Sequence, residues 1–177
     1  MQVIVLLRGV MPTGKNRIPR MADLVEILEH AGFQRVQTYI QSGNILLETE
    51  LPQAETARRI HDAIFEKLGA EFSVILKTKA QLAAAILENP FDDTYDASRI
   101  HLVFTNDQAN PAKVEELKAI TFAGEEFFAG DVCFYLYLPR SAEKKTLNSN
   151  YLERRLGVVA TTRKLSVVKR LYEMAEP

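Results

Sequence analysis

A run of five aliphatic residues, 3–7, lies near the start of the chain and ends abruptly at Arg8. Such a run is typical of a strand that is buried on both faces, because a half-buried strand alternates apolar and polar residues. The guanidinium that follows must find acceptors or reach solvent, since an unpaired charge in a protein core is strongly unfavourable. We therefore expect a central strand whose end opens, at Arg8, onto a solvent-filled cleft.

The loop after this strand has the spacing of a phosphate-binding P-loop but not its context. Gly9 and Gly14 are separated by four residues and Lys15 follows, yet Asn16 stands where the motif has the Ser or Thr that binds magnesium. Pro19 is favourable as the first residue of a helix, which places the helix start beyond Lys15. We therefore predict a strand-to-helix connection that supports no magnesium-dependent ATP hydrolysis.

Composition argues against several classes of protein. The chain has 22 basic and 23 acidic residues, so no global charge indicates a nucleic-acid or membrane partner. No signal peptide is recognisable, and no apolar segment approaches the roughly 18 residues of a membrane span. The single cysteine, Cys133, excludes a disulfide within the chain, and the histidines have no metal-ligand spacing. We expect a cytoplasmic protein without a metal site or membrane segment, and no cofactor is indicated.

Hydrophobic periodicity predicts nearly the same order of elements in each half of the chain. Residues 1–90 read as strand, helix, strand, strand, helix, strand and a further helix. Residues 91–177 read as strand, helix, hairpin, helix, a short strand at 158–160 and a last helix. This is the order of a split β-α-β, ferredoxin-like unit with an extra helix. We expect an α+β fold of two tandem ferredoxin-like halves, 1–90 and 91–177, produced by internal duplication.

A polar turn joins two predicted strands of the first half, near 35–40 and 45–48. Turn chemistry explains Gly43 and Asn44, which tolerate positive φ, but it does not explain Gln41. If the first two strands are neighbours, polar groups of this turn converge with Arg8 against an apolar wall. The predicted site binds a small polar or anionic molecule and is lined by Arg8, Asn16, Gln41, Ser42 and Asn44.

The C-terminal part of the chain is locally basic. Nine Lys or Arg residues lie within 140–170 against two glutamates, a local balance of +7. We expect the last helix to run from near residue 163 to 175, so that Thr161, Thr162 and Arg163 lie at its positive end and suit an anion. Arg163 is therefore a further ligand-binding candidate.

The same region supports the alternative function, a nucleic-acid-binding or protein-interaction module. Tyr135 and Tyr137 alternate with apolar residues, so one face of the predicted hairpin is aromatic. Such a face stacks bases in RNA-binding sheets, although packing within the molecule is the commoner use. The sequence indicates no catalytic group and no reaction, and so it does not separate an enzyme from a binding protein.

Several separate motifs occur in an order that resembles one bacterial family. They are LLRGV with GKN, MADL, TYIQSGN, NPF, YLYLP, and LERRLGV followed by T-x-R. Together they are similar to the uncharacterised family known as domain of unknown function 1697, over nearly the whole chain. The resemblance implies a cytoplasmic bacterial α+β protein of duplicated ferredoxin-like parts, and it implies no activity.

The chain departs from this family pattern at three places. It reads GVMPTGKN where the family typically reads GINVGGKN, and Arg163-Lys164-Leu165 where the family typically has Arg-Asn-Trp. Residues 142–146 replace the glycine-serine-lysine stretch that usually follows YLP. Chemistry that depends on those family side chains is not expected here.

Overall fold

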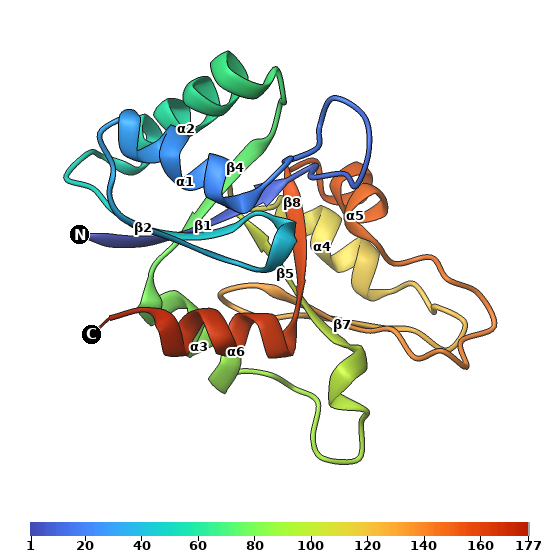
Figure 1. Ribbon diagram of the computed structural model, residues 1–177. Helices are drawn as coiled ribbons and strands as arrows, with labels where there is room; N and C mark the ends of the chain where they lie inside the picture. The colour runs from blue at the N-terminus through green and yellow to red at the C-terminus, as the bar shows by residue number, and fades with distance from the viewer. Residues whose placement is uncertain (177) are drawn as a thin grey trace. The chain divides into compact units, whose positions relative to one another are not determined.

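Two four-stranded antiparallel sheets and six α-helices make up the part of the chain that the computed structural model describes, residues 1–176 (Figure 1). The residues group into two units, each with one sheet. The first comprises residues 1–79 and the segment that begins at Glu173, and the second comprises residues 80–172. The mixed α and β architecture with two sheet-containing halves confirms that part of the prediction from the sequence. The grouping assigns most of the third helix, α3 (Lys79–Leu87), to the second unit, whereas the sequence analysis placed it in the first half.

The aliphatic run at the start of the chain forms a central strand, as predicted. The first sheet consists of β1 (Gln2–Arg8), β2 (Gln34–Tyr39), β3 (Asn44–Glu48) and β4 (Ser73–Lys77), in the order β2-β3-β1-β4. Neighbouring residues of β1 point to opposite faces of a sheet, and both Val5 and Leu6 are buried. The strand is therefore covered on both faces.

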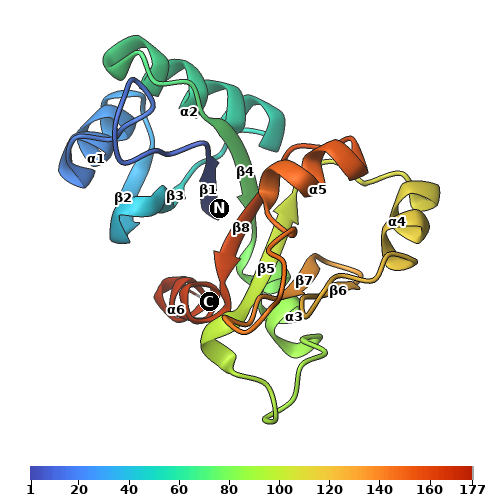
Figure 2. The same ribbon diagram turned by 90° about the vertical axis from the view of Figure 1, so that its right-hand side faces the viewer.

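Two helices cover one face of the first sheet (Figure 2). They are α1 (Met21–His30) and α2 (Gln53–Leu68). Their apolar stripes, with Leu28 on α1 and Ile60 on α2, pack in one core with residues of β1, β3 and β4. At the end of α2, the left-handed Gly69 donates its N–H to the carbonyl of Phe65 over 2.8 Å. The backbone signals of the sequence therefore set where this helix ends.

The second sheet repeats this arrangement of strands. It consists of β5 (Ile100–Thr105), β6 (Glu126–Ala129), β7 (Phe134–Tyr137) and β8 (Ala160–Lys164), in the order β6-β7-β5-β8. Each sheet thus has its strands in the order second, third, first, fourth, and every pairing is antiparallel. A helix follows the first strand and another follows the third strand in both units.

Helices lie on both faces of the second sheet. On one face, α4 (Pro111–Lys118) and α5 (Ser149–Leu156) contribute Leu117 and Leu152 to a core with β5, β7 and β8. On the other face, the hydroxyl of Tyr135 donates to the carbonyl of Ala85 in α3 over 2.6 Å. Tyr135 is fully buried, so it packs inside this unit, the commoner of its two expected uses, and cannot stack bases.

The last helix begins within two residues of its expected start, but the strand before it lies at 160–164 and not at 158–160. Residues 160–164 form β8, and Arg163 pairs with Leu102 of β5. The helix, α6 (Leu165–Met174), begins only after this strand. Thr161 and Arg163 are buried while Lys164 is exposed, an alternation of period two that pairing with β5 fixes. Thr161, Thr162 and Arg163 therefore belong to β8, and Arg163 lies two residues before the first residue of α6. The anion site at Arg163 stays a prediction.

Truncation of a core leucine in either unit is expected to destabilise the protein, because Leu28 and Leu152 are both 0% exposed. Leu28→Ala and Leu152→Ala should each lower the free energy of unfolding in urea by about 2–5 kcal/mol. Leu87→Ala is the matched control, since Leu87 in α3 is 87% exposed and its truncation should change stability by less than about 0.5 kcal/mol. An equal loss of unfolding free energy in all three variants would contradict the assignment of Leu28 and Leu152 to buried cores.

Candidate functional site

The register of the first sheet brings several strand ends together around Arg8. Arg8 ends β1 and pairs with Ser73, the first residue of β4. Asn44 begins β3 and pairs with both Leu6 of β1 and Tyr39, the last residue of β2. The loops that leave these strands must therefore lie at the same end of the sheet. We call this region the Arg8 end; it comprises Arg8, the loop 9–20, the turn 40–44 and the segment 69–72.

Asn16 clamps the first loop to the segment before β4. Its Nδ2 donates to the carbonyl of Glu71 over 3.2 Å, and its Oδ1 accepts from the N–H of Glu71 over 3.0 Å. Within the loop, the N–H of Met11 donates to the carbonyl of Asn16 over 2.8 Å. The amide that sequence analysis assigned to a ligand thus holds the main chain in place. The helix α1 begins at Met21, well beyond Lys15, so the loop lacks the context of a P-loop.

The amides of Gln41 and Asn44 also bond to the main chain. Gln41 Nε2 donates to the carbonyl of Ile18 over 3.2 Å. Asn44 Nδ2 donates to the carbonyl of Tyr39 over 3.1 Å and to Ser42 Oγ over 2.8 Å, and Asn44 is 0% exposed. A buried amide with satisfied hydrogen bonds fixes the shape of a turn. The structure therefore brings Gln41, Ser42 and Asn44 to the Arg8 end chiefly as residues that position the backbone.

A strained residue lies within this turn. Ile40 has a φ of +49°, a left-handed conformation that is rare for a β-branched residue and costs on the order of 1–3 kcal/mol. Its side chain is 49% exposed. Gly43 has no side chain, and its carbonyl accepts a hydrogen bond from the N–H of Leu7 over 2.9 Å. The surrounding hydrogen bonds hold the strained turn, which no pattern in the sequence reveals.

The Arg8 end carries an excess of positive charge. Arg8 is half-buried at the strand end, and Lys15 and Arg17 are exposed in the loop. Arg20 is engaged elsewhere, because it forms an ion pair with Asp23 at 2.5 Å. The hydrogen bond from Arg20 holds the pKa of the Asp23 carboxyl below its usual value.

Arg163 belongs to the second unit and lies in a different setting. Its Nη1 donates to Thr161 Oγ1 over 2.7 Å and to the carbonyl of Thr162 over 3.0 Å. The guanidinium is therefore held by residues of its own strand. The other eight basic residues of the region 140–170 are exposed on several elements.

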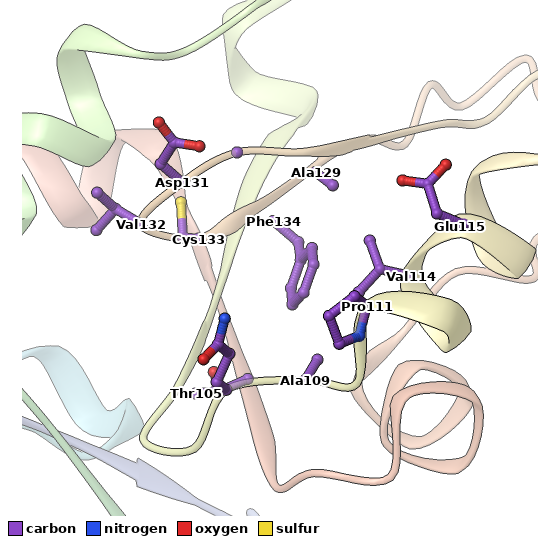
Figure 3. Close-up of a pocket in the computed structure, with 12 residues that line it drawn as sticks. Thr105, Ala109, Pro111, Val114, Glu115, Ala129, Asp131, Val132, Cys133 and Phe134 are labelled. Atoms are coloured by element: carbon purple, nitrogen blue, oxygen red, sulfur yellow. The ribbon is translucent and has the colours of Figure 1, made fainter.

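A hollow of about 270 Å³ in the second unit was not predicted from the sequence (Figure 3). It lies between α4 and the turn that joins β6 to β7, and it is bordered by the end of β5 at Thr105. The sequence signals at this place, the Asn110 cap with Pro111 and the turn at Gly130, located the elements correctly. These signals contain no information on the space between elements, so the hollow could be found only from the structure.

Two negative findings concern the residues that the structure describes. Across 1–176, His, Cys, Asp and Glu side chains form no group of three or more that could hold a metal ion. Over the same residues, the longest and most apolar helices still fall short of what crossing a membrane requires.

Gly43→Ala is expected to be more destabilising than Gly14→Ala, although both glycines have a positive φ, +77° and +82°. A Cβ at position 43 would lie 2.8 Å from the Cβ of Leu7 and 2.9 Å from a methyl of Val10, whereas a Cβ at position 14 would meet nothing within 4 Å. Gly14→Ala should therefore cost about 1–2 kcal/mol, the backbone term alone, and Gly43→Ala clearly more. Urea denaturation measures both, and equal losses would exclude the steric contribution.

Comparison with known proteins identifies the fold and the family. A solved structure described as that of the conserved bacterial protein SP0830 from Streptococcus pneumoniae is similar, with a TM-score of 0.75 and 18% sequence identity. The match covers 98% of this chain and 97% of that chain, and at this identity it shows the fold alone. The comparison with curated proteins found no match. The model of the family "Protein of unknown function (DUF1697)" matches residues 1–135, which confirms the resemblance seen in the motifs: the chain belongs to this family.

Proposed function

We propose that the protein binds a small anionic molecule at the Arg8 end of its first sheet. The observation that carries this proposal is the strained turn at Ile40, held by the buried amide of Asn44 beside the end of the central strand. Strain of this kind persists only where surrounding contacts over-determine it, and it is concentrated at binding and active sites. A rigid turn next to several cationic side chains suits a ligand of fixed geometry.

Arg8 is the proposed anchor for the ligand. A guanidinium has five N–H donors in a planar fork, so it can serve a structural acceptor and a ligand together. It pairs with a carboxylate or phosphate through two parallel hydrogen bonds. Lys15 and Arg17 add positive charge from the exposed loop, while Asn16, Gln41, Ser42 and Asn44 position the loops.

We also infer that the two halves are ferredoxin-like units that arose by internal duplication. The shared order of helices and strands supports this inference, and so does the shared strand order of the two sheets. The family motifs and the single cysteine support a bacterial, cytoplasmic origin.

The exposed cations of residues 140–170 favour a second candidate, binding of a nucleic acid. The two functions differ in their salt dependence. Binding that neutralises several phosphates weakens steeply as salt increases, whereas a pocket for one small molecule is affected much less. A titration with single-stranded and duplex oligonucleotides at two salt concentrations therefore tests the alternative directly.

A thermal-shift screen against nucleotides, sugar phosphates and amino acids tests the leading proposal. A ligand at 100 times its dissociation constant should stabilise the protein by about 2.7 kcal/mol. Arg8→Gln should weaken the binding of a ligand found in this way at least about tenfold, because a bidentate charged pair is lost. Arg58→Gln is the matched control, since Arg58 is exposed on α2 of the same unit and makes the same change of charge.

The proposal fails if anions of all three classes leave the unfolding temperature unchanged, or if Arg8→Gln and Arg58→Gln bind equally well. Arg8→Lys separates charge from geometry, because lysine keeps the charge but offers no planar fork. We expect Arg8→Lys to bind between the wild type and Arg8→Gln.

Magnesium-dependent ATP hydrolysis is not expected, because Asn16 is bonded to the main chain of Glu71 and α1 begins at Met21. Release of inorganic phosphate from ATP should match the buffer background in the wild type and in Lys15→Ala. Turnover in the wild type that disappears in Lys15→Ala would overturn this expectation.

A further inference from the structure

We propose that the hollow in the second unit binds a small organic cation, an ammonium group carried on an aromatic or apolar body. This site is separate from the Arg8 end and does not rest on the function proposed there.

Apolar side chains form one wall of the hollow, and the rest of its lining is polar or charged. The ring of Phe134 lies beside Pro111 and Val114, and Ala109 and Ala129 are close by (Figure 3). Phe127 supports this ring, with 5.6 Å between ring centroids and 26° between planes. A supported aromatic ring offers an apolar surface, and its π face attracts cations. The wall therefore suits the body of an amphipathic cation.

The charged groups at the hollow have one sign. Asp131 comes from the β6–β7 turn and Glu115 from α4, and their carboxylates lie on different sides of the hollow in Figure 3. The residues that line the hollow include no lysine, arginine or histidine. An anion would meet two carboxylates and no cation among the lining residues, whereas an ammonium group is attracted by both carboxylates.

Glu115 already has a cationic neighbour. Its Oε1 lies 2.9 Å from Nζ of Lys118, and the two side chains are 69% and 48% exposed. Exposed ion pairs between residues three apart contribute little to stability, because water and salt screen both charges. The ammonium group of a ligand can therefore pair with Glu115 in place of Lys118, but we expect Asp131 to contribute more to the preference for a cation.

The size of the hollow limits the ligand. Its volume, about 270 Å³, is at the lower end of the roughly 300–1,000 Å³ range of small-molecule pockets. One aromatic ring with a short amine substituent fits such a space. Benzylamine, benzyl alcohol and benzoate are therefore suitable probes, since they share a ring and size but carry a positive, a zero and a negative charge.

The test follows backbone amide shifts of the full-length protein by ¹H–¹⁵N NMR during titration with each probe. Benzylamine should cause saturable shifts at residues 105–115 and 129–134, benzyl alcohol weaker ones and benzoate none. Asp131→Asn should weaken benzylamine binding about two- to fivefold. Glu116→Gln is the matched control, because it removes one carboxylate from the same unit and Glu116, on α4 next to Glu115, does not line the hollow. The spectrum of each variant shows directly whether it is folded.

Cys133 gives an independent measure of occupancy. It lines the hollow and is the single cysteine of the chain, and it is only 5% exposed. A reagent therefore reaches its thiol only when the wall of the hollow opens, and a ligand bound there opposes that opening. Benzylamine should slow its reaction with the neutral reagent 4,4′-dithiodipyridine, and benzoate should not. Equal binding of the three probes would overturn the assignment to a cation. Benzylamine shifts that are absent, or that fall elsewhere in the chain, would overturn the site.

Discussion

The arrangement of the loops at the Arg8 end depends on the hydrogen bonds of one buried side-chain amide, that of Asn44. Its hydrogen bonds to the carbonyl of Tyr39 and to Ser42 Oγ close the turn between β2 and β3. A buried amide without partners is costly, so these bonds select one conformation of the turn. That conformation allows the positive φ of Ile40 and the close approach of Gly43 to Leu7. Together with the bond from the N–H of Leu7 to the carbonyl of Gly43, the bonds of Asn44 set the position of the turn relative to the central strand.

The loops at this end are fixed by side chains that bond to distant main chain. Asn16 joins the first loop to Glu71, and Gln41 joins the turn to Ile18. Such bonds make the loops rigid, while the cations of the first loop stay exposed. A rigid scaffold lowers the entropy that is lost when a binding site is ordered by its ligand. Asn16 and Gln41, which the sequence indicated as ligand-binding residues, thus bond to the main chain of other segments.

The sequence predicted elements whose signals are local and failed where the partner is distant. Five aliphatic residues were enough to identify β1, and Asn110 with Pro111 marked the start of α4. In contrast, Thr161 and Thr162 followed by cations resemble a helix start, and only pairing with β5 makes them a strand. The bonds of Asn16 span 55 residues, so no window of sequence contains both partners. That these residues meet at one end of the sheet could be predicted from the sequence, but the main-chain partners of their side chains could not.

The two units place their candidate sites at the same point of the same topology. Asn44 is the first residue of β3 and pairs with Leu6, two residues before the end of β1. Phe134 is the first residue of β7 and pairs with Val103, two residues before the end of β5. At one position a buried amide closes the turn beside cations; at the other an aromatic ring borders a hollow with carboxylates. Since both units share this arrangement of strand ends and turn, the two positions differ through these few side chains, which place exposed cations near the one and carboxylates near the other.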